Sequence, residues 1–130
     1  MGPAQVASNP TAVTKGGDAR GMQLVLVTCP KDSAEGIARE VLKRRLAACV
    51  STLHNVHSLY WWEGRLESAE ESLLLIKTRR ELFGELERTV RGIHPYQTPE
   101  IISFRAEKGS RRYLDWISKE TMPVARKKLQ

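Results

Sequence analysis

Two long β-like stretches joined by a tight turn constrain the fold of this chain more than any other feature. The first covers residues 48–62 and ends in the aromatic run LYWW, and the second covers residues 65–78. Glu63 and Gly64 lie between them and have the composition of a hairpin turn. Because strands joined by such a turn pair antiparallel, residues 48–78 predict a long β-hairpin in the middle of the chain.

Short strands and amphipathic helices flank this hairpin. Apolar runs at 23–28 and 101–104 predict two further strands, and helical spacing of apolar residues predicts three helices. The apolar faces of the two longer helices are Ala34, Ile37, Ala38, Val41, Leu42 and Leu46, and Leu82, Phe83, Leu86, Val90 and Ile93. The expected N-caps are Asp32 or Ser33, then Thr78 in a capping box with Glu81, then Ser110.

The order of elements, β-α-β-β-α-β-α, predicts a fold of the α+β class: a ferredoxin-like βαββαβ sandwich with an extra C-terminal helix. In that fold two helices cover one face of a four-stranded antiparallel sheet and leave the other face open. Trp61 is expected on one face of the hairpin, with Tyr60 and Trp62 on the other, so both faces need cover. The sequence therefore predicts that the chain assembles with partner chains.

The positive charge of the chain is concentrated near its ends. The formal net charge is +6 and the pI is about 9.6, but residues 23–118 hold 15 Lys and Arg against 13 Asp and Glu. We expect residues 22–118 to form the folded domain, 1–21 a flexible N-terminal extension and 119–130 a basic C-terminal tail. The small excess on the domain argues against nucleic acid as a partner, although DNA binding through the tails stays an alternative.

Other function classes lack the sequence features that they need. No apolar run approaches the ~18 residues of a membrane-spanning helix, so no membrane partner is expected. Cys29 and Cys49 are too few for a disulfide framework, which favours a reducing, cytoplasmic location. The chain has no GxSxG, P-loop or GxGxxG motif, so we expect no enzymatic activity and no catalytic residue.

Five blocks of sequence closely resemble the CutA divalent-cation-tolerance family. They are LAACV at 46–50, SLYWWEG at 58–64, LIKT at 75–78, HPYQTPE at 94–100 and YLDWI at 113–117. The resemblance covers residues 23–118 in the family's order and spacing. It implies a homotrimer of ferredoxin-like subunits, similar in architecture to the PII signalling proteins, in which small ligands occupy clefts between subunits. It also implies a role in tolerance to copper and other divalent cations.

The resemblance implies a site for copper(II) or another divalent cation, for which Cys49, His94 and Glu100 are the candidate ligands. Thiolate, imidazole and carboxylate groups all bind such ions. The family's other proposed cysteine positions hold Val27 and Thr89 here, so the complete thiol set is not present. Each of the two softer candidates has a structural alternative: Cys49 as a small buried residue, and His94 as a hydrogen-bonding group.

The remaining histidines do not add an evident chelate. His54 and His57 are three residues apart on a predicted strand, and the chain has no HxH or HExxH pair. Because side chains alternate along a strand, these two imidazoles are expected to point to opposite faces.

A cleft between subunits is the second candidate site, with Lys77, Trp62 and Tyr96 as its expected lining. Lys77 follows an apolar strand, where a lysine is costly to bury unless it is paired, so a salt bridge to Glu100 is the alternative. The preferred function is a homotrimeric protein that binds copper or other divalent cations during metal stress. The alternative function is a PII-like module that binds a small anion or a partner's loop in this cleft.

Overall fold

The computed structural model describes residues 16–18 and 21–123; the rest of the predicted extension and tail, 1–15, 19–20 and 124–130, lies outside the described residues. The strands are β1 (Gly16–Asp18), β2 (Met22–Cys29), β3 (Cys49–Trp62), β4 (Arg65–Arg79), β5 (Ile101–Arg105) and β6 (Lys108–Ser110). The helices are α1 (Lys31–Lys43), the 3-10 turn η2 (Arg80–Leu82), α2 (Phe83–Ile93) and α3 (Arg111–Glu120). Within the described ranges, no helix has the length and apolar character needed to cross a membrane.

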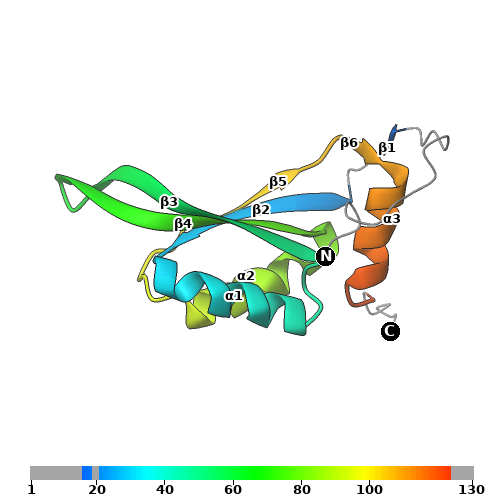
Figure 1. The fold of residues 1–130 in the computed structure, drawn as a ribbon, viewed down its shortest axis with the longest axis horizontal. Helices are drawn as coiled ribbons and strands as arrows, with labels where there is room; N and C mark the ends of the chain where they lie inside the picture. The colour runs from blue at the N-terminus through cyan, green and yellow to red at the C-terminus, as the bar shows by residue number, and fades with distance from the viewer. Residues whose placement is uncertain (1–15, 19–20, 124–130) are drawn as a thin grey trace.

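The central sheet has four strands in the order β3-β4-β2-β5, and each neighbouring pair is antiparallel. Helices α1 and α2 lie on one face of this sheet, and the described elements leave the opposite face uncovered (Figure 1). This arrangement confirms the predicted ferredoxin-like α+β fold with an added C-terminal helix. The core between sheet and helices is built from Val25, Val27, Cys29, Ala34, Ile37, Val41, Leu74, Ile76, Leu86 and Val90.

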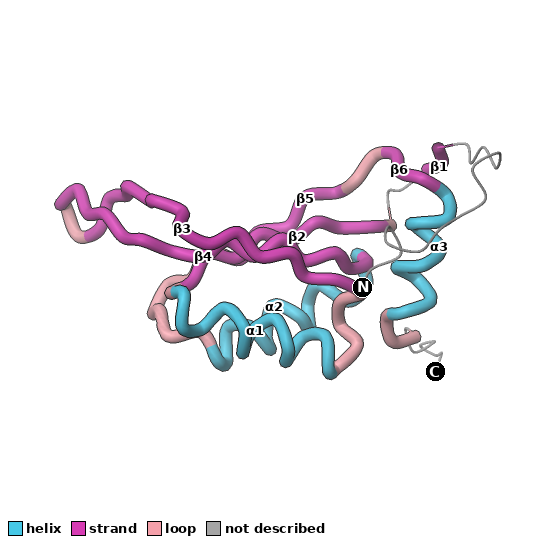
Figure 2. The backbone as a smooth tube through the Cα atoms, viewed as in Figure 1, coloured by secondary structure: helices cyan, strands magenta, loops and turns pink. Residues whose placement is uncertain are grey.

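The β3–β4 hairpin extends well beyond the ends of α1 and α2, as Figure 2 shows. Its turn is made by Glu63 and Gly64, with φ angles of 50° and 79°. Positive φ at both central residues is the geometry of a type I′ turn, whose twist matches that of the two strands. The predicted turn is confirmed, and it places the aromatic run of β3 in the projecting part of the molecule.

A β-bulge in β3 corrects the expectation for the two histidines. The pairing with β4 shifts between Leu53 and Val56, where Asn55 has a φ of 64°. One extra residue in a strand reverses the alternation beyond it. The imidazoles of His54 and His57 therefore lie on the same face.

The hydrogen bonds of the histidines show this directly. Nδ1 of His54 lies 2.6 Å from the Ser72 hydroxyl, and Nδ1 of His57 lies 2.7 Å from the Glu70 carboxylate. Ser72 and Glu70 are two residues apart on β4, so their side chains share a face of the sheet.

Helices α1 and α2 begin differently from expectation. Helix α1 has Pro30 in the N-cap position, and neither Asp32 nor Ser33 caps it. Proline suits the start of a helix because its fixed φ fits there and the first N–H groups need no intrahelical partner. Thr78 stays in β4, where its buried hydroxyl donates to the Leu46 carbonyl at 2.6 Å. The predicted capping box is therefore wrong, because a tertiary hydrogen bond takes the hydroxyl.

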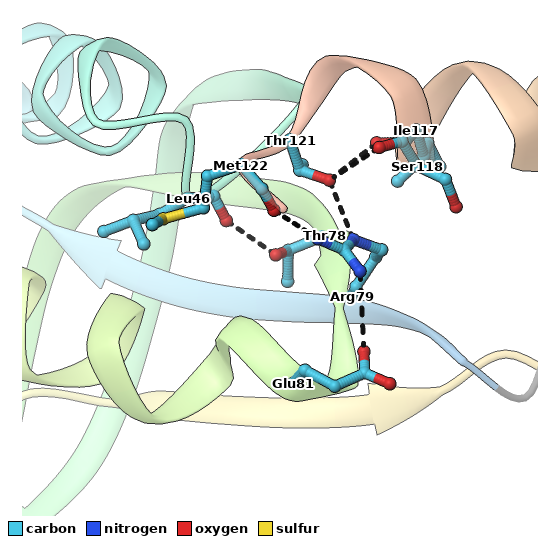
Figure 3. Close-up of polar contacts among 8 residues, drawn as sticks. All are labelled: Leu46, Thr78, Arg79, Glu81, Ile117, Ser118, Thr121 and Met122. Carbon is cyan, nitrogen blue, oxygen red and sulfur yellow. Dashed lines mark hydrogen bonds and ion pairs between the residues drawn. The ribbon is translucent and has the colours of Figure 1, made fainter. Parts of the chain in front are cut away.

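Helix α3 lies at one end of the sheet and is attached to β4 through Arg79 (Figure 3). The Arg79 guanidinium donates to the Thr121 hydroxyl at 2.8 Å and to the Met122 carbonyl, and lies 4.0 Å from the Glu81 carboxylate. Met122 also packs against the core. The predicted domain boundary at residue 118 therefore falls inside folded structure, because α3 continues to Glu120 and the two following residues contact the rest of the domain.

Candidate functional site

The face of the sheet opposite α1 and α2, which we call the open face, is apolar and exposed. The strand register places Leu24 and Leu26 of β2 beside Phe104 and Ile102 of β5 on this face. Ile102 is 46% exposed, Phe104 is 49% exposed, and Leu53 of β3 is 55% exposed. Soluble monomers rarely expose a continuous apolar surface of this kind, so the open face has the character of an interface.

The projecting end of the hairpin exposes apolar side chains on both of its faces. Leu59 and Trp61 lie on one face, where Trp61 pairs with Leu66 and is 73% exposed. Tyr60 and Trp62 lie on the other face and are 42% and 41% exposed. Aromatic residues of this kind are enriched in the buried cores of protein interfaces.

A groove of about 900 Å³ lies between the hairpin and the loop that follows α2. Residues 57–62 of β3 and Glu71 of β4 form one side of its lining. Residues 95–98 and Glu100 of the loop form the other, together with Thr28 at the end of β2. We call it the aromatic groove. It brings together Trp62, Tyr96 and Glu100, three of the six residues that the sequence singled out.

Glu71 is the buried acidic group of the aromatic groove. Glu71 is only 6% exposed, and the Tyr96 hydroxyl donates a hydrogen bond to its carboxylate at 2.8 Å. Burial, the hydrogen bond to Glu71 and the negative charge of Glu71 together raise the pKa of Tyr96 to about 12. Burial and, to a lesser degree, the same charge raise the pKa of the Cys29 thiol to about 11. Glu71 thus makes this part of the molecule electrically negative.

His94 holds the start of the groove-lining loop against β2. It is 8% exposed, and its Nε2 lies 2.8 Å from the Thr28 carbonyl. The Tyr96 backbone N–H donates to Nδ1 at 3.1 Å. Since Nδ1 accepts, Nε2 must carry the proton and donate, so both ring nitrogens are engaged within the chain. His94 positions Tyr96 for its contact with Glu71.

Cys49 and Lys77 lie together but away from the groove. They are cross-strand partners on the open face, and the Lys77 ammonium donates to the Ser51 hydroxyl at 2.5 Å and approaches the Cys49 sulfur at 3.8 Å. Within the described part of the chain, Lys77 forms no ion pair with Glu100. Glu100 instead accepts from the Thr28 hydroxyl at 3.4 Å.

The three candidate metal ligands do not converge within one chain. Cys49 pairs with Lys77, whereas the Thr28 that contacts His94 pairs with Leu73, four residues away on β4. At about 3.3 Å per residue, this separates the thiol from the imidazole by roughly 13 Å along the strand alone. The described residues contain no group of three or more His, Cys, Asp or Glu side chains that could hold a metal ion. A copper site made by one chain from this set does not fit.

Glu71 is the site residue that sequence reasoning missed. Strand alternation places it on the same face of β4 as Leu73 and Leu75, so an acidic residue lies directly beside the apolar pair of that face. An acidic residue next to this apolar pair is the signal in the sequence that could have identified it. Its proximity to Tyr96 depends on the loop after α2 and could not be read from the spacing.

Comparison with known proteins places this geometry in a family. A model of the CutA1 divalent ion tolerance protein family matches residues 23–120. A Xenopus laevis protein named Protein CutA homolog is 46% identical over 92 residues, which are 70% of this chain and 61% of the relative. This chain therefore spans less than two thirds of that relative's length.

A Thermus thermophilus protein named divalent-cation tolerance protein CutA is 39% identical over 100 residues, covering 76% of this chain and 97% of the relative. A solved structure of a divalent cation tolerance protein from the same organism superposes with a TM-score of 0.76 at 38% identity. That superposition covers 78% of this chain and 99% of the Thermus chain. The described fold is therefore the fold of these proteins.

Proposed function

Since the chain belongs to the CutA1 divalent ion tolerance family, we propose that it acts in divalent-cation tolerance as a non-enzymatic homotrimer that binds copper or other divalent cations. The observation that carries this proposal is the exposure of apolar side chains on the open face and of Leu59, Trp61 and Leu66 on the hairpin. Assembly with further copies removes this surface from water, which is favourable by about 25 cal/mol per Å² of apolar area. The number of three copies comes from the family resemblance.

Light scattering of the purified protein tests the assembly. We expect a mass of three chains of 14.7 kDa. Trp61→Asp should lower the mass towards that of one chain, because it places a charge in the proposed interface at a side chain that is 73% exposed within the chain. Arg88→Asp, on the exposed side of α2, is the control and should leave the mass unchanged. A parent protein with the mass of one chain would contradict the proposal.

We place cation binding between chains rather than within one. Cys49 lies on the open face, the surface that we propose to pack against other copies, so assembly can bring further ligands to its thiol. A site between chains explains how the protein can bind a cation although the described residues of one chain contain no group of three potential ligands. Divalent ions of this type need several convergent ligands, which a single thiol does not provide.

Calorimetry with copper(II), and with zinc as a redox-inert probe, tests this part of the proposal. We expect stoichiometric binding that Cys49→Ala weakens. Cys29→Ala is the matched control, because Cys29 is fully buried in the core and should not contribute a ligand. Equal binding by the parent and both variants would remove the thiol from the proposed site.

A second candidate function is a PII-like module that binds a small ligand, and the aromatic groove favours it. A volume of about 900 Å³ is within the range of about 300–1,000 Å³ that is common for ligand pockets. A screen of small molecules by thermal shift tests this candidate. A stabilising compound whose effect depends on Trp62 or Tyr96 supports it, and the absence of any such compound contradicts it.

We also propose that the protein is cytoplasmic. Cys29 and Cys49 are both free thiols, as is usual in a reducing compartment. Fractionation of cells that express the full-length protein tests the proposal, and recovery from an oxidising compartment would contradict it.

A further inference from the structure

We infer that the aromatic groove binds a small organic ammonium ion, with Glu71 as the counter-charge and Tyr60, Trp62 and Tyr96 as aromatic walls. The inference deepens the ligand-binding function proposed above, because it names the class of the ligand and replaces the anion expected from the sequence. It does not depend on the metal site proposed between chains.

The charge of Glu71 is the first argument. Glu71 is only 6% exposed. The Tyr96 hydroxyl, which donates a hydrogen bond to its carboxylate, carries no charge that could balance it. No Lys, Arg or His of the described residues forms an ion pair with it. A buried carboxylate is costly unless a positive charge accompanies it. A cationic ligand in the groove would supply that charge.

The composition of the lining is the second argument. The groove is lined by two carboxylates, Glu71 and Glu100, by the imidazole of His57, whose Nδ1 lies 2.7 Å from the Glu70 carboxylate, and by no Lys or Arg from the described part of the chain. The sequence predicted Lys77 in the lining of an anion cleft. In the structure its ammonium group contacts Ser51 and Cys49 on the open face instead. A concave surface lined by one sign of charge concentrates ions of the opposite sign. The lining therefore selects a cation over an anion.

The aromatic rings distinguish an organic cation from a metal ion. Trp, Tyr and Phe faces attract ammonium groups, and such rings recur where proteins recognise alkylated ammonium ligands. Hard divalent ions require about six oxygen ligands, whereas the groove offers two carboxylates and, among the described residues, no metal-binding group of three. A ligand with a positive nitrogen and an apolar body complements both parts of this surface.

Three probes of the same length and different charge test the inference: n-butylammonium, n-butanol and butyrate. Each is titrated into the assembled protein in the presence of EDTA and at constant ionic strength. Binding is followed by the change in tryptophan fluorescence, to which Trp61 and Trp62 of the groove lining and Trp116 of α3 contribute. We expect n-butylammonium to bind roughly 10-fold more tightly than either other probe. Equal affinities, or tighter binding of butyrate, would overturn the inference.

Two variants assign the selectivity to Glu71. Glu71→Gln should lower the affinity for n-butylammonium roughly 10-fold, to the level of n-butanol. Glu85→Gln is the matched control, because Glu85 is an exposed carboxylate on α2 that does not line the groove. Unchanged affinity in Glu71→Gln, or an equal loss in Glu85→Gln, would refute the assignment.

If Glu71→Gln does not fold, Trp62→Leu tests the inference instead, because it removes one aromatic ring from the groove. It should weaken n-butylammonium roughly threefold or more, and unchanged affinity would contradict the inference. Light scattering is recorded on every sample. Unchanged ammonium affinity in a variant whose assembly mass has changed also contradicts the inference. Failure of copper binding leaves these results unaffected, so the two proposals fail separately.

Discussion

Replacement of His94 by alanine separates a structural role of this histidine from a role as a metal ligand. The substitution removes the hydrogen bonds to the Thr28 carbonyl and from the Tyr96 N–H, each worth about 1 kcal/mol. It also removes a ring contact with Tyr96, whose centroid lies 4.9 Å away, for roughly 0.5–1.5 kcal/mol more. We expect His94→Ala to lower the free energy of unfolding by about 2–4 kcal/mol in the absence of metal.

The measurement is thermal unfolding in EDTA at fixed protein concentration. For a domain of this size, the expected loss lowers Tm by roughly 10–25 °C. His57→Ala is the control, because His57 is exposed and its carboxylate partner Glu70 is also exposed, so the change should stay within about 1 kcal/mol. Unchanged stability of His94→Ala in EDTA, combined with loss of copper binding, would refute the structural role and favour the ligand role.

Three further predictions concern Cys29, Thr78 and Glu63. The pKa of the Cys29 thiol is raised from 9.0 to about 11, so the unfolded chain loses the thiol proton first. The resulting stabilisation, on the order of 3 kcal/mol, is present below pH 9 and is lost as the pH rises to about 11. Urea unfolding across this range should show that loss in the parent relative to Cys29→Ala, and parallel pH profiles would contradict it. Thr78→Val should cost about 1–3 kcal/mol in the same assay, because the buried Leu46 carbonyl loses its donor at 2.6 Å. Glu63→Asn should stabilise the hairpin by roughly 0.5–1 kcal/mol, since Asn adopts the observed positive φ more readily, and a lower Tm would count against the type I′ assignment.

Much of the fold could be predicted because its signals are local. The apolar run at 23–28, the helical spacing in α1 and α2 and the turn at Glu63 and Gly64 each report on a short segment. The order of these segments then leaves few ways to build a four-stranded sheet with two helices on one face. The short pairing of β1 with β6 was missed, because three-residue strands rich in glycine have no periodic pattern.

The candidate site was predicted only in part. Trp62, Tyr96 and Glu100 do line one groove, but Cys49 and Lys77 lie elsewhere on the open face and His94 has both ring nitrogens engaged. Residue type suggested which groups can bind a cation. It did not give their separation, which depends on how far each lies along β2 and β4.

Residue type and spacing were sufficient for the class of fold, the hairpin, the exposure of aromatic residues on both of its faces and membership of the family. The tertiary structure alone decided three other properties: the bulge at Asn55 that brings His54 and His57 to one face, the separation of Cys49 from His94, and the burial of Glu71 beside Tyr96. The physical reason is that each of these properties depends on contacts between segments far apart in the chain. Periodicity describes which face a side chain occupies, whereas strand register and loop packing decide what it meets there.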